Sequence, residues 1–258
     1  MPGLILQLQH FFLVVLRVGS VLLFLPIWNS RTVPKQIKVF SVLVIALALT
    51  PVVAGTLPPF PQTWVALLFL VLRELLLGLS LGLVVRFVFD GAQMAGTLLG
   101  VQMGFGMVTL IDPQTADSSS LIGDVFSLTA TVLFLALDGH HLLLRVLAQS
   151  FGEVPVGGPA LMPASLFSFL IPMGSVMFEL MVKLVAPILL VLFLTQVAMG
   201  LVARTVPKVQ VMIMAFPVTI ALGLIFLSLT MTLIGYQLSG RFAWFQGPLF
   251  QVLKLWHG

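Results

Sequence analysis

Cysteine is absent from this sequence of 258 residues, and charged residues are scarce. The absence of cysteine excludes disulfide bonds, zinc sites built on thiolates and a cysteine nucleophile. Asp, Glu, Lys and Arg together make up 8% of the residues, whereas an ordinary soluble domain contains about 25%. Because so few charges cannot cover the surface of a soluble fold, the soluble class is excluded as well.

Hydrophobic residues make up 60% of the chain, and the mean hydropathy is +1.19. They arrive in long runs with few or no charges, as membrane-spanning helices do. Six runs are candidate spans, at 11–28, 39–54, 64–85, 121–138, 184–203 and 211–235. The sequence therefore predicts an all-α, polytopic helical membrane protein with about six long apolar helices.

Two segments do not fit a simple alternation of spans and connectors. Residues 86–120 hold five glycines, too many for an ordinary spanning helix, yet they are too apolar for a solvent loop. We expect a Gly/Met-rich loop there, after the third helix. Residues 161–183 are punctuated by proline and fit a re-entrant helix, an interfacial helix or a seventh span. With 139–160 as a connector and no soluble segment, we expect one membrane-embedded subunit over residues 1–258.

The net charge of +4 comes from Lys and Arg that lie mostly in short connectors between the runs, where membrane topology places them. No basic stripe is present, so we expect the lipid bilayer as a partner and no nucleic acid. The first cation, Arg17, lies inside the first run and no A-x-A site follows, so we expect this helix to be retained rather than cleaved.

Charged residues fall within or beside the apolar runs, among them Arg17, Arg73, Glu74 and Glu179. A central Arg costs about 2.5–3.5 kcal/mol on the insertion scale, so such residues are paired or face a wet cavity. One interpretation is an ion or proton relay, and the other is ion pairing between subunits of an assembly. The small number of acidic residues in the spans favours pairing. We also expect the helix of Arg17 to be marginal alone and steadied by partner subunits.

Spaced glycines form a second pattern. Gly78 and Gly82 lie four residues apart, as do Gly96, Gly100 and Gly104. Glycine at this spacing makes a flat stripe on which another helix backbone approaches closely. We expect helix packing at these five positions, either within the chain or against a partner.

The motif Asp138-Gly139-His140-His141 invites comparison with a metal site. Adjacent residues on a helix point about 100° apart, so we expect that the two His residues share no ion and that no metal is bound. A serine from 118–120 with a His base would make an intramembrane hydrolase, but no G-x-S-x-G elbow accompanies those serines. We expect a polar helix boundary here, and no enzyme and no cofactor.

Glycines flank Phe105, and methionines lie nearby, in the run GVQMGFGM at 100–107. Glycine permits unusual backbone angles, and methionine is soft and unbranched. This combination suits a deformable pore seal, and it also suits a packed re-entrant loop.

At this loop the sequence resembles a known family. The runs GVQMGFGMVTLIDPQTADSS (100–119) and FLALDGHHLLLRVLAQSF (134–151) are similar to FliR, a membrane protein family of the flagellar type III export apparatus. The runs at 25–51 and 204–223 resemble the family's first and last connectors with the helices that follow them, so the likeness covers nearly the whole chain.

The resemblance implies a non-enzymatic subunit of the export gate in the bacterial inner membrane, at the flagellar basal body. Its partners would be FliP-, FliQ- and FlhB-like membrane subunits, and unfolded flagellar proteins would pass through the gate. It also implies that the Gly/Met-rich loop plugs the closed pore, which places Met103, Phe105, Met107 and Ile111 at the gate. Two alternatives remain beside it: a secondary transporter of small solutes, and the equivalent subunit of a virulence injectisome.

Overall fold

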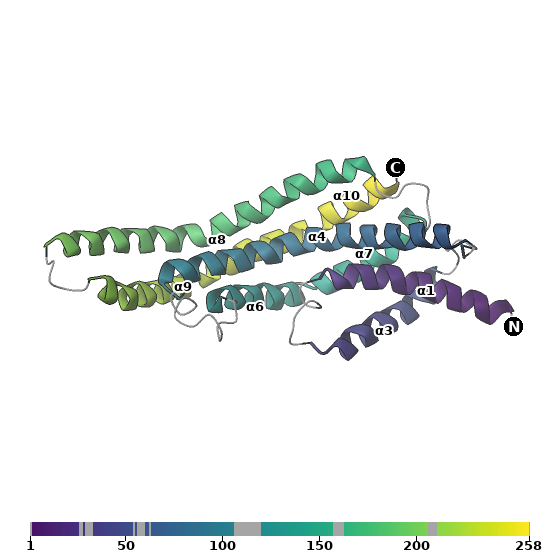
Figure 1. Cartoon of the computed structure of the whole chain (residues 1–258), viewed down its shortest axis with the longest axis horizontal. Helices are drawn as coiled ribbons and strands as arrows, with labels where there is room; N and C mark the ends of the chain where they lie inside the picture. The colour runs from purple at the N-terminus through teal and green to yellow at the C-terminus, as the bar shows by residue number, and fades with distance from the viewer. Residues whose placement is uncertain are drawn as a thin grey trace. The chain divides into compact units, whose positions relative to one another are not determined.

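The computed structural model describes residues 2–25, 28, 33–53, 55, 60–61, 63–105, 120–156, 163–205 and 211–257. Within these residues no strand occurs, and the chain is built from α-helices (Figure 1). Their bounds are α1 (Pro2–Leu23), α3 (Lys35–Val53), α4 (Trp64–Met103), α6 (Leu121–Ala136), α7 (Gly139–Glu153), α8 (Ala164–Thr205), α9 (Val211–Trp244) and α10 (Gln246–His257). The all-α prediction is confirmed.

The chain divides into two compact units. The first comprises Met1–Phe87, Asp138–Gly174 and Ala243–Gly258, and the second comprises Val88–Leu137 and Ser175–Phe242. Three long helices, α4, α8 and α9, therefore each contribute one part to either unit. The two compact units are called the first unit and the second unit below.

In the first unit, α1 packs along α3, and α7 packs against both α3 and α10 (Figure 1). The buried positions follow the helical period of 3.6 residues, which gives each helix one apolar stripe. They are Leu13, Val14, Val18 and Val21 in α1, Leu143, Val146, Leu147 and Phe151 in α7, and Leu249, Val252, Leu253 and Trp256 in α10.

The second unit has an aromatic core. Phe89 of α4, Phe134 of α6 and Phe242 of α9 are buried, and their ring centroids lie 5.5–5.6 Å apart in edge and tilted arrangements. Such geometry is favoured by the quadrupole of each ring. Glu179 of α8 adds a polar link, since it pairs with Lys183 at 2.6 Å and with Arg241 of α9 at 2.8 Å.

By length and composition, four helices among the described residues can cross a membrane: Lys35–Val53, Trp64–Met103, Ala164–Arg204 and Ala215–His257. The number becomes five if α6 and α7 form one broken span. The polytopic prediction is thus confirmed, with four or five spans in place of about six. The apolar part of α1 that can be assessed, Gln7–Leu23, is too short to qualify.

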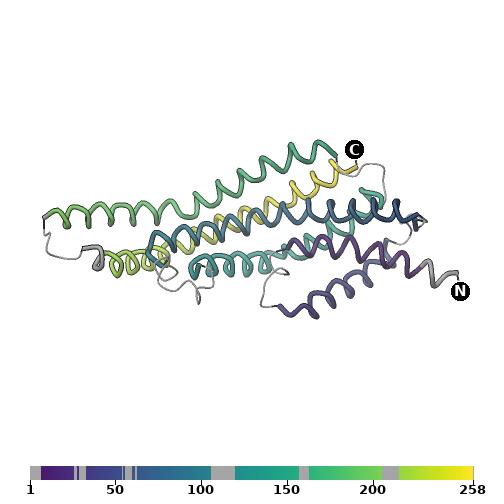
Figure 2. Tube along the Cα trace, in the orientation of Figure 1, coloured from purple at the N-terminus to yellow at the C-terminus, as the bar shows by residue number. Residues whose placement is uncertain are grey.

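Three segments differ from expectation, because each is helical where the sequence indicated a loop, a connector or a break between two runs. The glycine-rich residues 86–103 extend α4, since close helix neighbours compensate for the low helix propensity of glycine. Residues 164–183 and 184–203 form the single helix α8, shown as one unbroken coil in Figure 2, which continues through Pro172 and Pro187. Residues 139–160, expected as a connector, contain α7.

Candidate functional site

Arg17, Arg73 and Glu74, the charges that the sequence places within apolar runs, all lie in the first unit. Arg17 donates from Nε to Glu74 Oε2 at 2.5 Å and from Nη2 to Glu74 Oε1 at 2.8 Å. Its Nη1 donates to the carbonyls of Ser150 and Val154 at 2.7 and 3.0 Å, and its guanidinium lies over the Phe151 ring at 4.5 Å. Arg17 and Glu74 are fully buried. The pair lies within one chain, which differs from the expected pairing between subunits.

Arg73 is the neighbour of this pair but does not join it. Its side chain is only 5% exposed, and within the described structure its Nε and Nη1 have no hydrogen-bond partner. The nearest ring is that of Trp256, whose centroid is 5.8 Å from Arg73 Cζ. Trp256 is itself fixed by a hydrogen bond from Nε1 to Ser80 Oγ at 3.1 Å.

Gly78 and Gly82 lie where α1 and α4 approach each other in the first unit. A Cβ at Gly78 would overlap the Ser20 side chain and lie 2.6 Å from the Ser20 carbonyl carbon, and one at Gly82 would overlap Phe24. The contacts Arg17–Glu74, Ser20–Gly78 and Phe24–Gly82 follow one another at intervals of about one helical turn. Residue numbers rise together on both sides, so the two segments run in the same direction. The close approach serves packing inside the chain.

Gly96 and Gly100 serve the same purpose in the second unit. A Cβ at Gly96 would lie 2.5 Å from the carbonyl oxygen of Ile122, and one at Gly100 would lie 2.6 Å from Ser120 Oγ. Ser120 is the N-cap of α6, and its Oγ accepts a hydrogen bond from the Gly123 amide at 3.2 Å. The two glycines therefore seat the start of α6 directly on α4.

Gly104 differs from the other four, because it ends α4 rather than lying on a helix stripe. Its φ is +96°, in the left-handed region that glycine enters without steric cost. The Gly104 amide donates to the Val101 carbonyl at 3.1 Å, and the Phe105 amide donates to the Gly100 carbonyl at 3.0 Å. These two bonds make a Schellman C-cap, so the glycine-rich segment leaves the helix at a defined residue.

Met103, the first residue expected at the gate, is fully buried in the second unit. A Cβ added at Gly223 of α9 would lie 2.7 Å from the Met103 methyl carbon, so the thioether fills the notch that this glycine leaves. Thr219 Oγ1 of α9 also lies 3.3 Å from the Met103 carbonyl oxygen, within hydrogen-bond distance, although the carbonyls of Ala215 and Phe216 are closer acceptors. Met103 thus anchors the loop and does not present a free apolar surface. Phe105 is half-buried, and Met107 and Ile111 lie outside the described residues.

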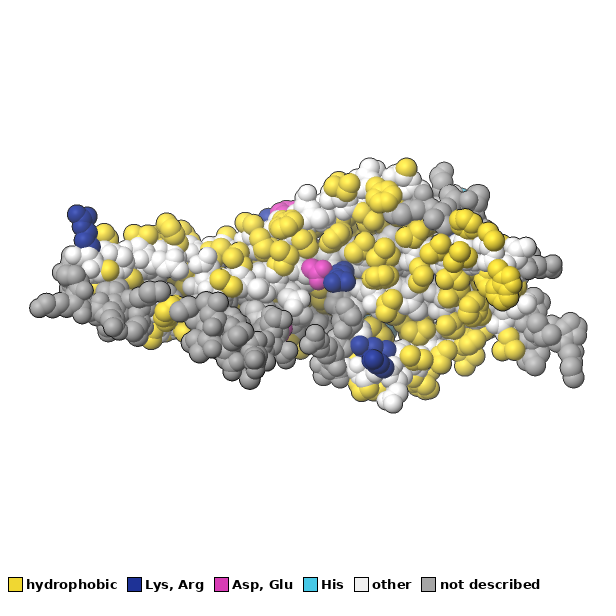
Figure 3. Space-filling model, viewed as in Figure 1, with side chains coloured by type: hydrophobic (Ala, Val, Ile, Leu, Met, Phe, Trp, Pro, Cys, Tyr) yellow, Lys and Arg dark blue, Asp and Glu magenta, His cyan; other side chains and the backbone are white. Residues whose placement is uncertain are grey.

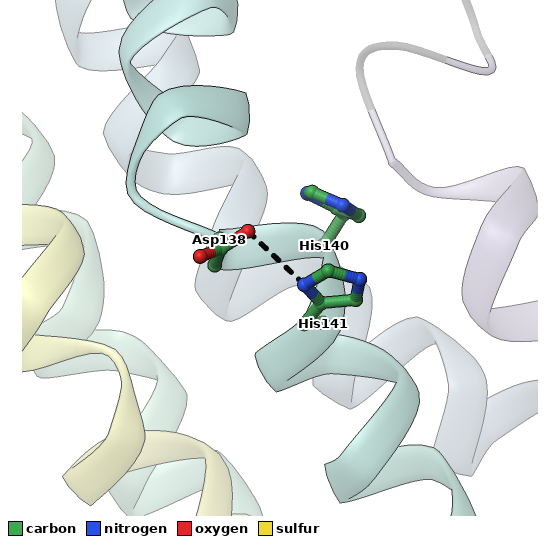
Figure 4. Close-up of side chains that lie close together, drawn as sticks. All are labelled: Asp138, His140 and His141. Atoms are coloured by element: carbon green, nitrogen blue, oxygen red, sulfur yellow. Dashed lines mark hydrogen bonds and ion pairs between the residues drawn. The ribbon is translucent and has the colours of Figure 1, made fainter.

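The His motif lies at the junction of α6 and α7. Asp138 has a left-handed backbone, with φ at 56°, and His141 Nδ1 lies 3.0 Å from Asp138 Oδ1 (Figure 4). The rings of His140 and His141 stack at 4.1 Å, because neighbouring imidazoles can turn toward each other from adjacent helix positions. The reasoning that they diverge is therefore wrong, since one donor atom from each of the three residues lies within 4.8 Å of the others.

This cluster still falls short of a structural zinc site, which uses four protein donors. The side chains of His141 and Asp138 are 66% and 72% exposed. The arrangement is a His–Asp pair at a polar helix boundary, and the absence of a bound metal remains a prediction.

Comparison with known proteins places the chain among export proteins. The model of a family described as bacterial export proteins, family 1, matches residues 8–244. The chain is 30% identical to the flagellar biosynthetic protein FliR of Escherichia coli (strain K12) over 228 residues, which cover 88% of this chain and 86% of that protein. It is 31% identical over 226 residues to FliR of Bacillus subtilis (strain 168), covering 87% and 86%.

The chain belongs to the FliR family. As a FliR-family protein it is a membrane-embedded component of the flagellar export apparatus, and the small-solute transporter considered from the sequence is set aside.

Four positions that matter in this FliR-family chain were not singled out from the sequence. Gly223 lies in a charge-free run and has no glycine four residues away, so no spacing signal marks it. Thr219 and Ser150 are lone hydroxyl residues among apolar neighbours. Trp256 did carry a signal, because Leu249, Val252, Leu253 and Trp256 share one helix face.

Proposed function

We propose that this FliR-family chain joins FliP- and FliQ-like subunits, with an FlhB-like protein docked on them, to form the gate that exports unfolded flagellar proteins. It acts as one membrane-embedded subunit over residues 1–258, in the bacterial inner membrane at the flagellar basal body, and it carries no catalytic residue and no cofactor. The flagellar names of its relatives favour this system over a virulence injectisome.

The observation that carries the proposal is the length of the exposed apolar face of α8. Its exposed large apolar residues begin with Phe167, 57% exposed, and end with Val202, 47% exposed, with the half-exposed ion pair of Glu179 and Lys183 between them. At about 1.5 Å per residue this face extends about 52 Å along the helix. The hydrocarbon core is about 30 Å thick, and even a helix tilted by about 40° crosses it within about 39 Å.

Lipid therefore does not cover this face from end to end. Figure 3 shows hydrophobic side chains spread over the visible face, with few charged groups among them. Apolar side chains outside the bilayer need contact with another protein, because large exposed apolar patches mark interaction sites. Polytopic partner subunits stacked along α8 meet that need, as the proposed hetero-oligomer requires.

The loop from Met103 to Ile111, called the gate loop below, is the proposed seal. Support comes from its base, where Met103 is locked into α9 and Gly104 turns the chain out of α4. The chain returns at Ser120, which touches the helix at Gly100. A loop whose two ends are fixed on packed helices can move aside for a polypeptide while its subunit stays folded.

The proposal is tested by co-purification. The tagged chain is expressed with and without FliP- and FliQ-like proteins of the same bacterium, extracted in detergent and weighed intact by native mass spectrometry. We expect a defined hetero-oligomer with the partners, and without them only poor recovery of polydisperse material. A monodisperse, protease-resistant monomer or homo-oligomer that ignores the partners would overturn it and favour a transporter.

A further inference from the structure

Arg73 is a buried cation, and two of its guanidinium nitrogens, Nε and Nη1, have no hydrogen-bond partner in the described structure. We propose that Arg73 receives a carboxylate from a membrane helix of a neighbouring subunit, and so couples assembly of the export gate to the neutralisation of a buried charge. This inference rests on the proposed hetero-oligomer.

Among the described residues, two nitrogens of the Arg73 guanidinium lack an acceptor. Arg73 is 5% exposed, and its Nε and Nη1 are buried without a hydrogen-bond partner in the described structure. Burying a charge without pairing costs several kcal/mol in general. Its guanidinium lies over the face of Trp256, with the ring centroid 5.8 Å from Cζ. An aromatic face attracts a cation but accepts no N–H hydrogen bond in the plane of the guanidinium.

No carboxylate in the described part of the first unit is available to Arg73. Glu74 is adjacent in sequence, but both of its oxygens already accept bonds from Arg17. Asp138 pairs with His141, and Glu153 is exposed. The buried cluster therefore contains two guanidinium groups, Arg17 and Arg73, and one carboxylate. One negative charge is missing among the described residues of the first unit, and a neighbouring subunit can supply it.

The depth of Arg73 along α4 favours a protein carboxylate over a lipid phosphate. Arg73 lies nine residues into α4 from Trp64, or about 14 Å along the helix axis, which is near the middle of a span that starts there. A lipid phosphate lies at the bilayer surface and does not match this depth. Leu72 and Phe69, beside Arg73 on α4, are 39% and 55% exposed. They offer an apolar face on which a partner helix can pack and present an Asp or Glu.

Removal of the Arg73 charge is expected to have opposite effects on the free chain and on the complex. Removing an unpaired buried charge relieves the free chain of its desolvation cost. Removing one member of a buried ion pair across an interface weakens binding by at least about thirtyfold, which corresponds to the lower end of the usual 2–5 kcal/mol. Arg73→Met is thus expected to leave the chain as stable as before, or more so, while it disrupts the complex.

The experiment compares Arg73→Met with Arg17→Met, the matched control on the internally paired arginine. Each full-length variant is expressed alone to measure its degradation half-life in membranes by pulse-chase. Each is also expressed with FliP- and FliQ-like partners to measure recovery of the complex. We expect Arg73→Met to keep or lengthen the half-life but lose the complex, and Arg17→Met to shorten the half-life. Arg73→Lys should recover part of the complex.

The acidic partner is then identified by charge exchange. Arg73→Glu is combined with single Asp→Arg or Glu→Arg changes in the membrane helices of the partner subunits. Restoration of complex recovery by one such change supports the inference and names the residue, and restoration by none of them counts against it.

Each other outcome has a defined meaning. If wild-type chain forms no complex with these partners, the proposed function fails. If wild type forms the complex and Arg73→Met forms it equally well, only the Arg73 inference fails. If Arg73→Met shortens the half-life as Arg17→Met does, Arg73 has an internal role and the inference is wrong. If it lowers retention of phosphatidylglycerol in native mass spectra without reducing complex recovery, the ligand is a lipid phosphate and the inference is also wrong.

Discussion

Arg17 and Glu74, 57 residues apart in sequence, form a two-point ion pair with both residues fully buried. The remaining Nη1 of Arg17 is taken up by two backbone carbonyls of the segment that ends α7. One side chain of α1 therefore ties together α4 and α7, which are remote from it in the chain.

This ion pair predicts a non-additive mutational cycle. Arg17→Met or Glu74→Met alone leaves an uncompensated buried charge and should cost about 3–5 kcal/mol, whereas the double variant should be nearly neutral. Pulse-chase half-lives in membranes should fall for both single variants and recover in the double one. If the half-life of the double variant is shortened by the sum of the two single effects, the two charges act separately.

Close packing at Gly96 predicts sensitivity to a single methyl group. Gly96→Ala places Cβ 2.5 Å from the backbone oxygen of Ile122, and backbone cannot move aside as a side chain does. Overpacking of this kind costs about 1–3 kcal/mol, so complex recovery and motility should both fall. Gly200→Ala in α8 is the matched control, because nothing lies within 4 Å of its Cβ. Equal behaviour of the two variants would contradict the packing.

The notch at Gly223 predicts a reciprocal pair of substitutions. Gly223→Ala should push Met103 out of its seat and disturb the gate loop, because the added Cβ lies 2.7 Å from the Met103 methyl carbon. Shortening the displaced side chain, as Met103→Ala in the same chain, should restore export measured by motility and flagellin secretion. Gly235→Ala, also in α9 but in open space, should have no effect. Failure of the double variant to recover would mean that Met103 is not the residue displaced.

The gate loop predicts a leak without loss of assembly. Deletion of residues 105–109 removes soft apolar side chains while α4, α6 and their glycine contacts remain. The complex should be recovered in full, while the resting membrane conducts ions and growth slows on induction. The control replaces the same five residues with Gly and Ser, keeping length but removing the apolar surface, and should also leak. If the complex that carries the deletion assembles fully and the membrane remains ion-tight, the loop is not part of the gate.

Several of these features were predictable because the bilayer imposes simple rules on sequence. Helical class followed from charge-poor apolar runs, and the cost of a charge in lipid singled out Arg17 and Glu74. Their mutual pairing did not follow, because no local pattern relates two residues 57 positions apart. Gly78, Gly82, Gly96 and Gly100 were recognised from spacing alone, although spacing does not name the surface they touch.

Other features were missed for identifiable reasons. Residues 86–103 were expected as loop because glycine has a low helix propensity, which tertiary contacts with α6 override. The start of α7 was hidden because the chain turns at Asp138 through a left-handed conformation that an Asp rarely adopts. Met103 was expected on a surface, since nothing in the sequence shows that Gly223 leaves room for it.

The length of α8 also bears on how the chain enters the membrane. Insertion requires about 20 apolar residues, and α8 contains 42. Glu179 and Lys183 divide it into a charge-free stretch at 164–178 and a longer one at 184–203. The second stretch is the only one of the two with about 20 residues free of charge, so we expect it to set the first register of α8 in the bilayer. The final depth of this helix is then decided by its neighbours, so for α8 insertion and placement are two separate events.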